Sequence, residues 1–158
     1  MPLGPASLHG QVFYATGDDD IDDGDAEAFF GIGGGGAGWA YYWSEIMGLG
    51  MFDNQFSAGS PNGDVSNMWA ANIGATIKPM EKLSLTGDLW YAQLVEDDFV
   101  TDETDLGFEI DLKATYQLTE GLNMALVGAY LFADDATSID GDNQDDPYEI
   151  GTQLSLSF

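Results

Sequence analysis

The sequence lacks cysteine and arginine altogether and has very little positive charge. Its 158 residues include 28 Asp and Glu but only three basic residues, all of them lysines, and the formal net charge is −25. The absence of cysteine excludes a disulfide scaffold, a thiolate metal site and a cysteine nucleophile. A nucleic-acid partner is excluded as well, because phosphate binding needs Lys and Arg to displace counterions.

Long apolar runs are also missing. No 18 consecutive apolar residues occur, so we expect no transmembrane helix. The first ten residues, MPLGPASLHG, contain no basic segment followed by an apolar one, so they are not a signal peptide. We expect either that such a peptide has been removed or that the chain is a piece of a longer one. At 44% hydrophobic, the chain is too apolar for an acidic disordered protein, and its length suits one domain.

The acidic residues gather in three blocks. Residues 18–27 carry seven carboxylates, residues 96–105 carry six and residues 134–146 carry six. Like charges at this density repel one another and stay solvated, so we expect loops at these positions.

Between the blocks, apolar and polar residues alternate. Residues 106–118 read LGFEIDLKATYQL, in which the even-numbered positions from Leu106 to Leu118 are apolar and most of the odd-numbered ones are polar. A strict period of two over thirteen residues predicts a strand and excludes an amphipathic helix. The predicted strand is longer than the usual strand of a soluble protein.

The same test predicts further strands over residues 68–78, 82–95, 122–132 and 148–158, and a less regular one over 8–16. Short turns (78–82 and 118–122) alternate with long acidic connections, an arrangement typical of an antiparallel up-and-down barrel of the outer-membrane kind. We therefore expect an all-β transmembrane barrel domain or barrel segment over 1–158. Residues 67–158 supply five strands in up-and-down order, and 17–66 form a long acidic and glycine-rich loop region.

The ending, YEIGTQLSLSF, resembles the C-terminal strand of Gram-negative outer-membrane porin-type barrels. In that family the last strand alternates and finishes on a phenylalanine that the barrel-assembly machinery reads. The resemblance implies that Tyr148 and Phe158 belong to an insertion signal. It also implies an outer-membrane location, with contacts to the lipid bilayer or lipopolysaccharide.

The number of strands leaves two alternatives open. Residues 28–47 supply two further short strands, which would let eight strands close by themselves. Otherwise, 17–66 are one loop with a helical turn at Trp43–Met47, and six strands belong to a larger barrel or close by association of copies. Four consecutive glycines at 33–36 and the short first segment count against the eight-stranded alternative.

Oxygen ligands are spaced in two of the acidic blocks as in loops that bind hard cations, so Ca²⁺ is a possible ligand there. No twelve-residue EF-hand pattern fits either block. The alternative is a solvated loop without an ordered ion. The candidate metal ligands are Asp18, Asp20, Asp22, Asp140, Asp142 and Asp146.

The polar faces of the strands are candidates for lining a water-filled lumen. The alternative is a filled interior of a small barrel, in which Lys113 pairs with Glu109, Asp111 or another carboxylate. The predicted lumen-facing residues are Asn72, Asp88, Glu109, Asp111, Lys113, Gln117, Glu149 and Gln153.

Catalysis is not expected. His9 is the single histidine, and no serine or cysteine nucleophile with a base partner is apparent. The aromatic residues Trp39, Tyr41, Tyr42 and Trp43 are candidates for stacking on sugars, although packing within a loop or an interfacial belt explains them better.

The function expected is that of a porin-like outer-membrane protein that passes small hydrophilic solutes and prefers cations because its mouth is acidic. The alternative is a non-conducting small or self-associating barrel with a structural role and acidic loops that bind divalent cations. A soluble calcium-loaded β-sandwich explains the aromatic residues at the strand ends less well.

Overall fold

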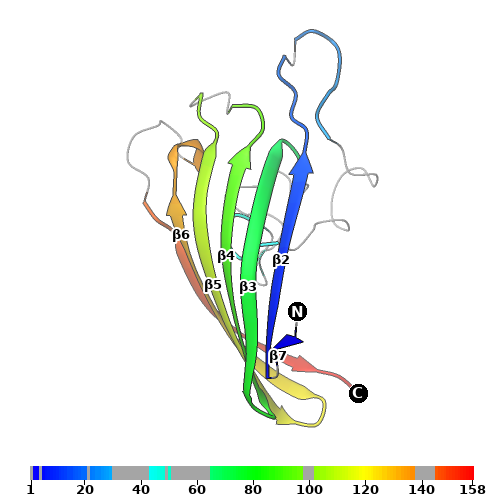
Figure 1. The fold of residues 1–158 in the computed structure, drawn as a ribbon, viewed down its shortest axis with the longest axis vertical. Helices are drawn as coiled ribbons and strands as arrows, with labels where there is room; N and C mark the ends of the chain where they lie inside the picture. Colours follow the sequence, from blue (N-terminus) through cyan, green and yellow to red (C-terminus); the bar gives the residue numbers. More distant parts are fainter. Residues whose placement is uncertain are drawn as a thin grey trace.

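The alternating segments form one antiparallel sheet in the computed structural model of the chain (Figure 1). The structure describes residues 2–3, 5–20, 22–29, 43–48, 50, 65–97, 102–137 and 145–158. The strands are β1 (Pro2–Leu3), β2 (Ala6–Ala15), β3 (Met68–Met80), β4 (Leu83–Leu94), β5 (Asp105–Thr119), β6 (Leu122–Ala133) and β7 (Tyr148–Leu156).

Every strand pairs with its neighbours in chain order, from β1 to β7. The six long strands β2–β7 confirm the predicted antiparallel up-and-down order. Strand β1 covers only the start of β2, with Leu3 opposite Ala6. Within the described residues the sheet does not close, because β7 and the β1–β2 side are both edges.

The eight-stranded alternative is not what the described residues form. Of the segment 28–47 that it needed, residues 43–47 are not in a strand and lead into a turn at 46–48, and residues 30–42 lie outside the described part. The sheet therefore corresponds to the six-stranded alternative. Because β2 and β7 run in opposite directions, β7 of one copy has the direction needed to pair antiparallel with β2 of another.

Tight turns occur at one end of the sheet and long connections at the other (Figure 1). Two-residue turns at 81–82 and 120–121 join β3 to β4 and β5 to β6. Gly121 has φ +77°, in the left-handed region where only glycine is free of steric cost. The three acidic blocks fall between strands at the opposite end, apart from Asp105, which is the first residue of β5.

The two faces of the sheet differ in chemistry. On the outer face, which carries Leu112, large apolar side chains are open to solvent, and Leu112 itself is 61% exposed. On the inner face, which carries Asp111, side chains such as Trp90, Val127 and Glu109 are buried. The exposed apolar residues of the long strands are Leu8, Val12, Tyr14, Ile73, Ile77, Met80, Leu89, Phe108, Ile110, Leu112, Tyr116, Leu118, Met124, Leu126, Tyr130, Tyr148, Phe132, Ile150, Leu154 and Leu156.

The alternation predicted for β5 is wrong at Leu106. Ala92 pairs with Gly107 and Gln93 pairs with Asp105, so Leu106 is the extra residue of a β-bulge. The bulge turns Leu106 away from the even-numbered outer residues and into the buried cluster with Trp43 and Leu131. Gly107 makes this possible with φ +114°.

Among the described residues, no helix is long and apolar enough to span a membrane. The helical element found there is η1 (Asp135–Thr137), a single turn of 3-10 helix.

Candidate functional site

The pairing register brings the predicted polar residues onto the inner face. Asp88 is opposite Asp111, which is opposite Ala129, which in turn is opposite Glu149. Residues directly opposite in an antiparallel pair project to the same side. The other positions follow from the same register, so the inner face carries Asn72, Asp88, Glu109, Asp111, Lys113, Gln117, Glu149 and Gln153.

A short segment of the long connection between β2 and β3 is buried against this face. Residues 43–48, called the inward turn below, have every side chain buried, with Met47 and Ser44 fully inaccessible. The Gly48 amide donates to Ser44 Oγ at 2.6 Å, which closes the turn. A Cβ atom at Gly48 would lie 2.7 Å from the Ser44 nitrogen and 2.8 Å from the Trp43 ring, so the turn needs glycine there.

One carboxyl group of the sheet accepts three hydrogen bonds from the inward turn. The amides of Glu45 and Ile46 donate to Glu109 Oε1 at 2.8 and 2.7 Å, and the amide of Met47 donates to Glu109 Oε2 at 2.7 Å. Glu109 is 0% exposed. Three backbone donors therefore satisfy both oxygens of this buried carboxyl group.

Aromatic packing completes the attachment. Trp43 is 2% exposed and lies between Phe13 of β2 and Trp90 of β4, with edge-to-face ring pairs at 5.3 and 5.4 Å. Such a residue is not accessible to a sugar, so Trp43 packs within the protein. Trp39, Tyr41 and Tyr42 lie outside the described residues.

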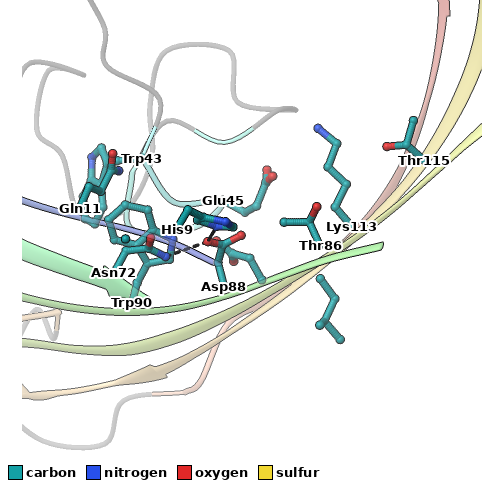
Figure 2. A pocket seen from close by; sticks show the side chains of 13 residues that line it. His9, Gln11, Trp43, Glu45, Asn72, Thr86, Asp88, Trp90, Lys113 and Thr115 are labelled. Atoms are coloured by element: carbon teal, nitrogen blue, oxygen red, sulfur yellow. Dashed lines mark hydrogen bonds and ion pairs between the residues drawn. The ribbon is translucent and has the colours of Figure 1, made fainter. Parts of the chain in front are cut away.

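A cavity of about 410 Å³ lies between the inward turn and the strands. Figure 2 shows Trp43 and Glu45 of the turn, with His9, Asp88 and Lys113 of the strands, around the same space on the concave side of the sheet. Both charge signs line it.

One end of the cavity holds a hydrogen-bonded cluster. Asp88 Oδ1 lies 2.7 Å from His9 Nε2 and accepts from Asn72 Nδ2 at 2.8 Å (Figure 2). A Cβ atom at Gly74 would collide with both Asp88 Oδ1 and His9 Nε2, so the small residue leaves room for the pair. Among the described residues that line the cavity, Thr86 and Thr115 carry hydroxyl groups, and none is a serine or a cysteine.

Acidic side chains of the inward turn and of β5 also line the cavity. Asp111 is only 8% exposed and lies within electrostatic reach of Glu109 and Glu45. Its Oδ1 atom is buried and has no hydrogen-bond partner among the described residues. Lys113 also lines the cavity, but in the described part of the chain it forms no ion pair, so the pairing expected for the alternative of a filled small barrel is not made there.

The predicted metal ligands of the first acidic block fold on their own backbone. Asp18 and Asp20 carboxylates accept from the amides two residues further on, at 3.3 and 3.1 Å. These are Asx turns, which order a loop without an ion. Asp22 contributes its backbone amide to the second of these turns. The pKa of Glu27 is raised, mainly by the negative charge of Asp19 and next by desolvation.

In the last acidic block, Asp146 accepts from Tyr130 Oη at 3.0 Å and from the Ala133 amide at 3.1 Å, while Asp140 and Asp142 lie outside the described residues. Across the described part of the chain, no three His, Asp or Glu side chains are grouped as a metal site requires.

Sequence reasoning missed the partners of these inner-face residues. Glu45, His9 and Trp90 line the cavity, yet none was a predicted site residue. A turn was expected at Trp43–Met47, but no local pattern indicates which strand residue it contacts. None of the protein-family models, curated proteins or solved structures compared with the chain matches it.

Proposed function

We propose that the chain forms part of the wall of an outer-membrane β-barrel of the porin type, which passes small hydrophilic solutes and prefers cations. The observation that carries the proposal is the chemistry of the two faces, which is the reverse of that in a water-soluble protein. Large apolar side chains cover the outer face, whereas buried carboxylates such as Glu109 and Asp111 lie on the inner one. A contiguous apolar face on this scale is unfavourable in water and favourable in lipid.

Strand length and aromatic residues support the same proposal. Strands β2–β7 have 9 to 15 residues, and a tilted strand needs about 9–11 to cross a bilayer. Near the end with the long connections, aromatic side chains follow one another across the outer face, where membrane barrels carry an interfacial girdle. Register and ring contacts join Tyr14, Trp69, Tyr91, Phe108, Phe132, Tyr130 and Tyr148 in this row.

The preference for cations follows from the charges of the inner face. Glu45, Asp88 and Asp111 line the cavity against Lys113 and His9. A buried side-chain oxygen without a partner, such as Asp111 Oδ1, is unfavourable, and contact with a passing cation would offset this cost. The acidic loops raise the local cation concentration at one end in the same way.

Conductance in planar bilayers tests the proposal. Protein refolded and inserted into a bilayer should conduct, and the reversal potential in a KCl gradient should show a preference for K⁺. Asp88→Asn, which removes a carboxylate that lines the cavity, should reduce the ratio of K⁺ to Cl⁻ permeability, while Glu120→Gln, in the β5–β6 turn, should leave it unchanged. A preference for Cl⁻ contradicts the proposal.

Absence of conductance in protein that has inserted favours the structural alternative. One observation supports that alternative: the inward turn already fills part of the space on the inner face, and Met47 within it is fully buried. A non-conducting barrel would use this packing for stability alone, and its acidic loops for divalent cations.

A further inference from the structure

We infer that Glu109 is a positioning residue, whose carboxylate holds the inward turn on the inner face and so sets the width of the cavity beside it. The three consecutive amides of residues 45–47 converge on its two oxygens at 2.7 to 2.8 Å. The inference rests on the proposed function only in its consequence for solute passage, because the attachment itself is a property of the fold.

The carboxylate suits this task better than any neutral side chain of the same size. Both of its oxygens accept, and hydrogen bonds to an ionised acceptor are stronger than those between neutral groups. A glutamine has one acceptor oxygen, and its NH₂ group would face a backbone N–H. In Glu109→Gln, at least one of the three amides of the turn therefore loses its partner within a buried site.

The position of the turn determines what the cavity contains. Trp43 and Glu45 belong to the turn and line the cavity, while Asp111 and Lys113 line it from β5 (Figure 2). Release of the turn would withdraw one set of lining side chains and leave the other in place. The cavity would then be wider and would lose the Glu45 carboxylate, so solute passage should become faster and less selective.

Hydrogen exchange of the intact protein tests the attachment directly. In Glu109→Gln, the amides of residues 45–47 should exchange about tenfold faster or more, as expected for loss of a charge-assisted hydrogen bond. Amides of β5 and β6 should exchange at nearly the wild-type rate, whereas a merely structural role would accelerate them too. Glu120→Gln, the same chemical change in the β5–β6 turn, is the control. Unchanged exchange at 45–47 overturns the inference, and so does equal acceleration throughout the sheet.

A second variant tests the attachment from the side of the turn, in case Glu109→Gln fails to fold. Gly48→Ala introduces a methyl group against the Ser44 nitrogen and the Trp43 ring and leaves Glu109 unchanged. Because the protein has no cysteine, Ile46→Cys supplies a unique thiol at a buried position of the turn. In the Ile46→Cys background, Gly48→Ala should accelerate maleimide labelling about tenfold. Labelling that stays slow, in folded protein, contradicts the inference.

Conductance separates this inference from the proposed function. Faster exchange together with a larger single-channel conductance in Glu109→Gln supports both. Faster exchange in protein that never conducts supports the positioning role and contradicts solute passage. Conductance that is the same in wild type and Glu109→Gln, with faster exchange, shows that the turn does not set the width and overturns that part of the inference.

Discussion

At the scale of single residues, neighbours in the sequence of a strand lie on opposite faces of the sheet and differ in exposure. Leu112 points outward and is 61% exposed, while Asp111 beside it points inward and is 8% exposed. Such a contrast arises because side chains alternate across a strand. A substitution at one position of β5 therefore tests one face without directly changing the other.

Arginine substitutions compare the two faces of β5. Leu112→Arg should reduce the free energy of unfolding by about 2–4 kcal/mol if this position lies at mid-depth of a bilayer. Thr115 is opposite Ser84 on the inner face. Thr115→Arg should reduce the free energy of unfolding much less, because a charge on this face remains hydrated. Folding titrations into lipid vesicles measure both values. Equal costs would contradict the membrane part of the proposed function.

The first acidic block allows a test at a single carboxyl group. Asp19 raises the pKa of the exposed Glu27 above its ordinary value of 4.5, chiefly by charge repulsion. In Asp19→Asn, the Glu27 pKa should fall back toward that value, and NMR titration of the Glu27 side chain measures this. Asp25→Asn is the control, since Asp25 is not among the causes of the shift.

The sign of the pH dependence follows from that shift. A carboxyl group with a raised pKa binds its proton more readily in the folded state than in the unfolded one. Its unfavourable contribution is therefore present above the folded pKa and disappears as the pH falls through it. Lowering the pH through this range should therefore increase the order of the loop over 18–27 more in wild type than in Asp19→Asn. The opposite order would contradict the assigned cause.

At the scale of elements, β5 is the strand that organises the site. It carries Glu109, Asp111 and Lys113, and its bulge directs Leu106 inward against the buried cluster. Bulges add one residue and locally bend the strand. The bulge therefore allows Leu106, at the start of β5, to pack beneath the inward turn. The other even-numbered residues of β5 lie on the outer face.

The bulge depends on a glycine. Gly107→Ala should reduce the free energy of unfolding by about 1–3 kcal/mol, because a non-glycine residue is strained at φ +114° and its Cβ would collide with the Phe132 carbonyl oxygen. Gly128→Ala is the matched control, since its Cβ would meet only the Glu149 carbonyl oxygen at 3.7 Å. Urea titrations of the two variants should differ clearly. Similar costs would show that the bulge is not strained by a side chain.

At the scale of the whole molecule, charge and apolar surface are separated. Nineteen of the 28 acidic residues lie in the three acidic blocks at one end, and the apolar side chains cover the outer face of the strands. The connections repel one another over about 10 Å at moderate ionic strength. An ion that binds two carboxylates relieves this repulsion more effectively than screening does.

Divalent cations should consequently stabilise the protein more than sodium does. Removal of Ca²⁺ and Mg²⁺ by a chelator should lower the thermal midpoint, and millimolar Ca²⁺ should restore it. Sodium chloride at matched ionic strength is the control. Equal recovery in sodium would show that the acidic loops are only screened, and no effect of either salt would show that they act independently of the sheet.

The sequence by itself determined the strands, because their order depends on local periodicity. Alternation located β3–β7 to within a few residues, and short turns set antiparallel neighbours. It also separated Leu112 from Asp111 correctly, since a shift by one residue would exchange the two faces. The less regular β2 was found for the same reason, with bounds displaced by one or two residues.

Only the tertiary structure decided which residues meet on the inner face. The contact of the inward turn with Glu109 joins residues more than sixty positions apart, and no local pattern encodes that pairing. The position of Leu106 was also decided by the tertiary structure, because a β-bulge interrupts an alternation that is unbroken in the sequence. Periodicity shows how a strand divides its own side chains between two faces. The partners that these side chains meet depend on contacts between residues far apart in the sequence.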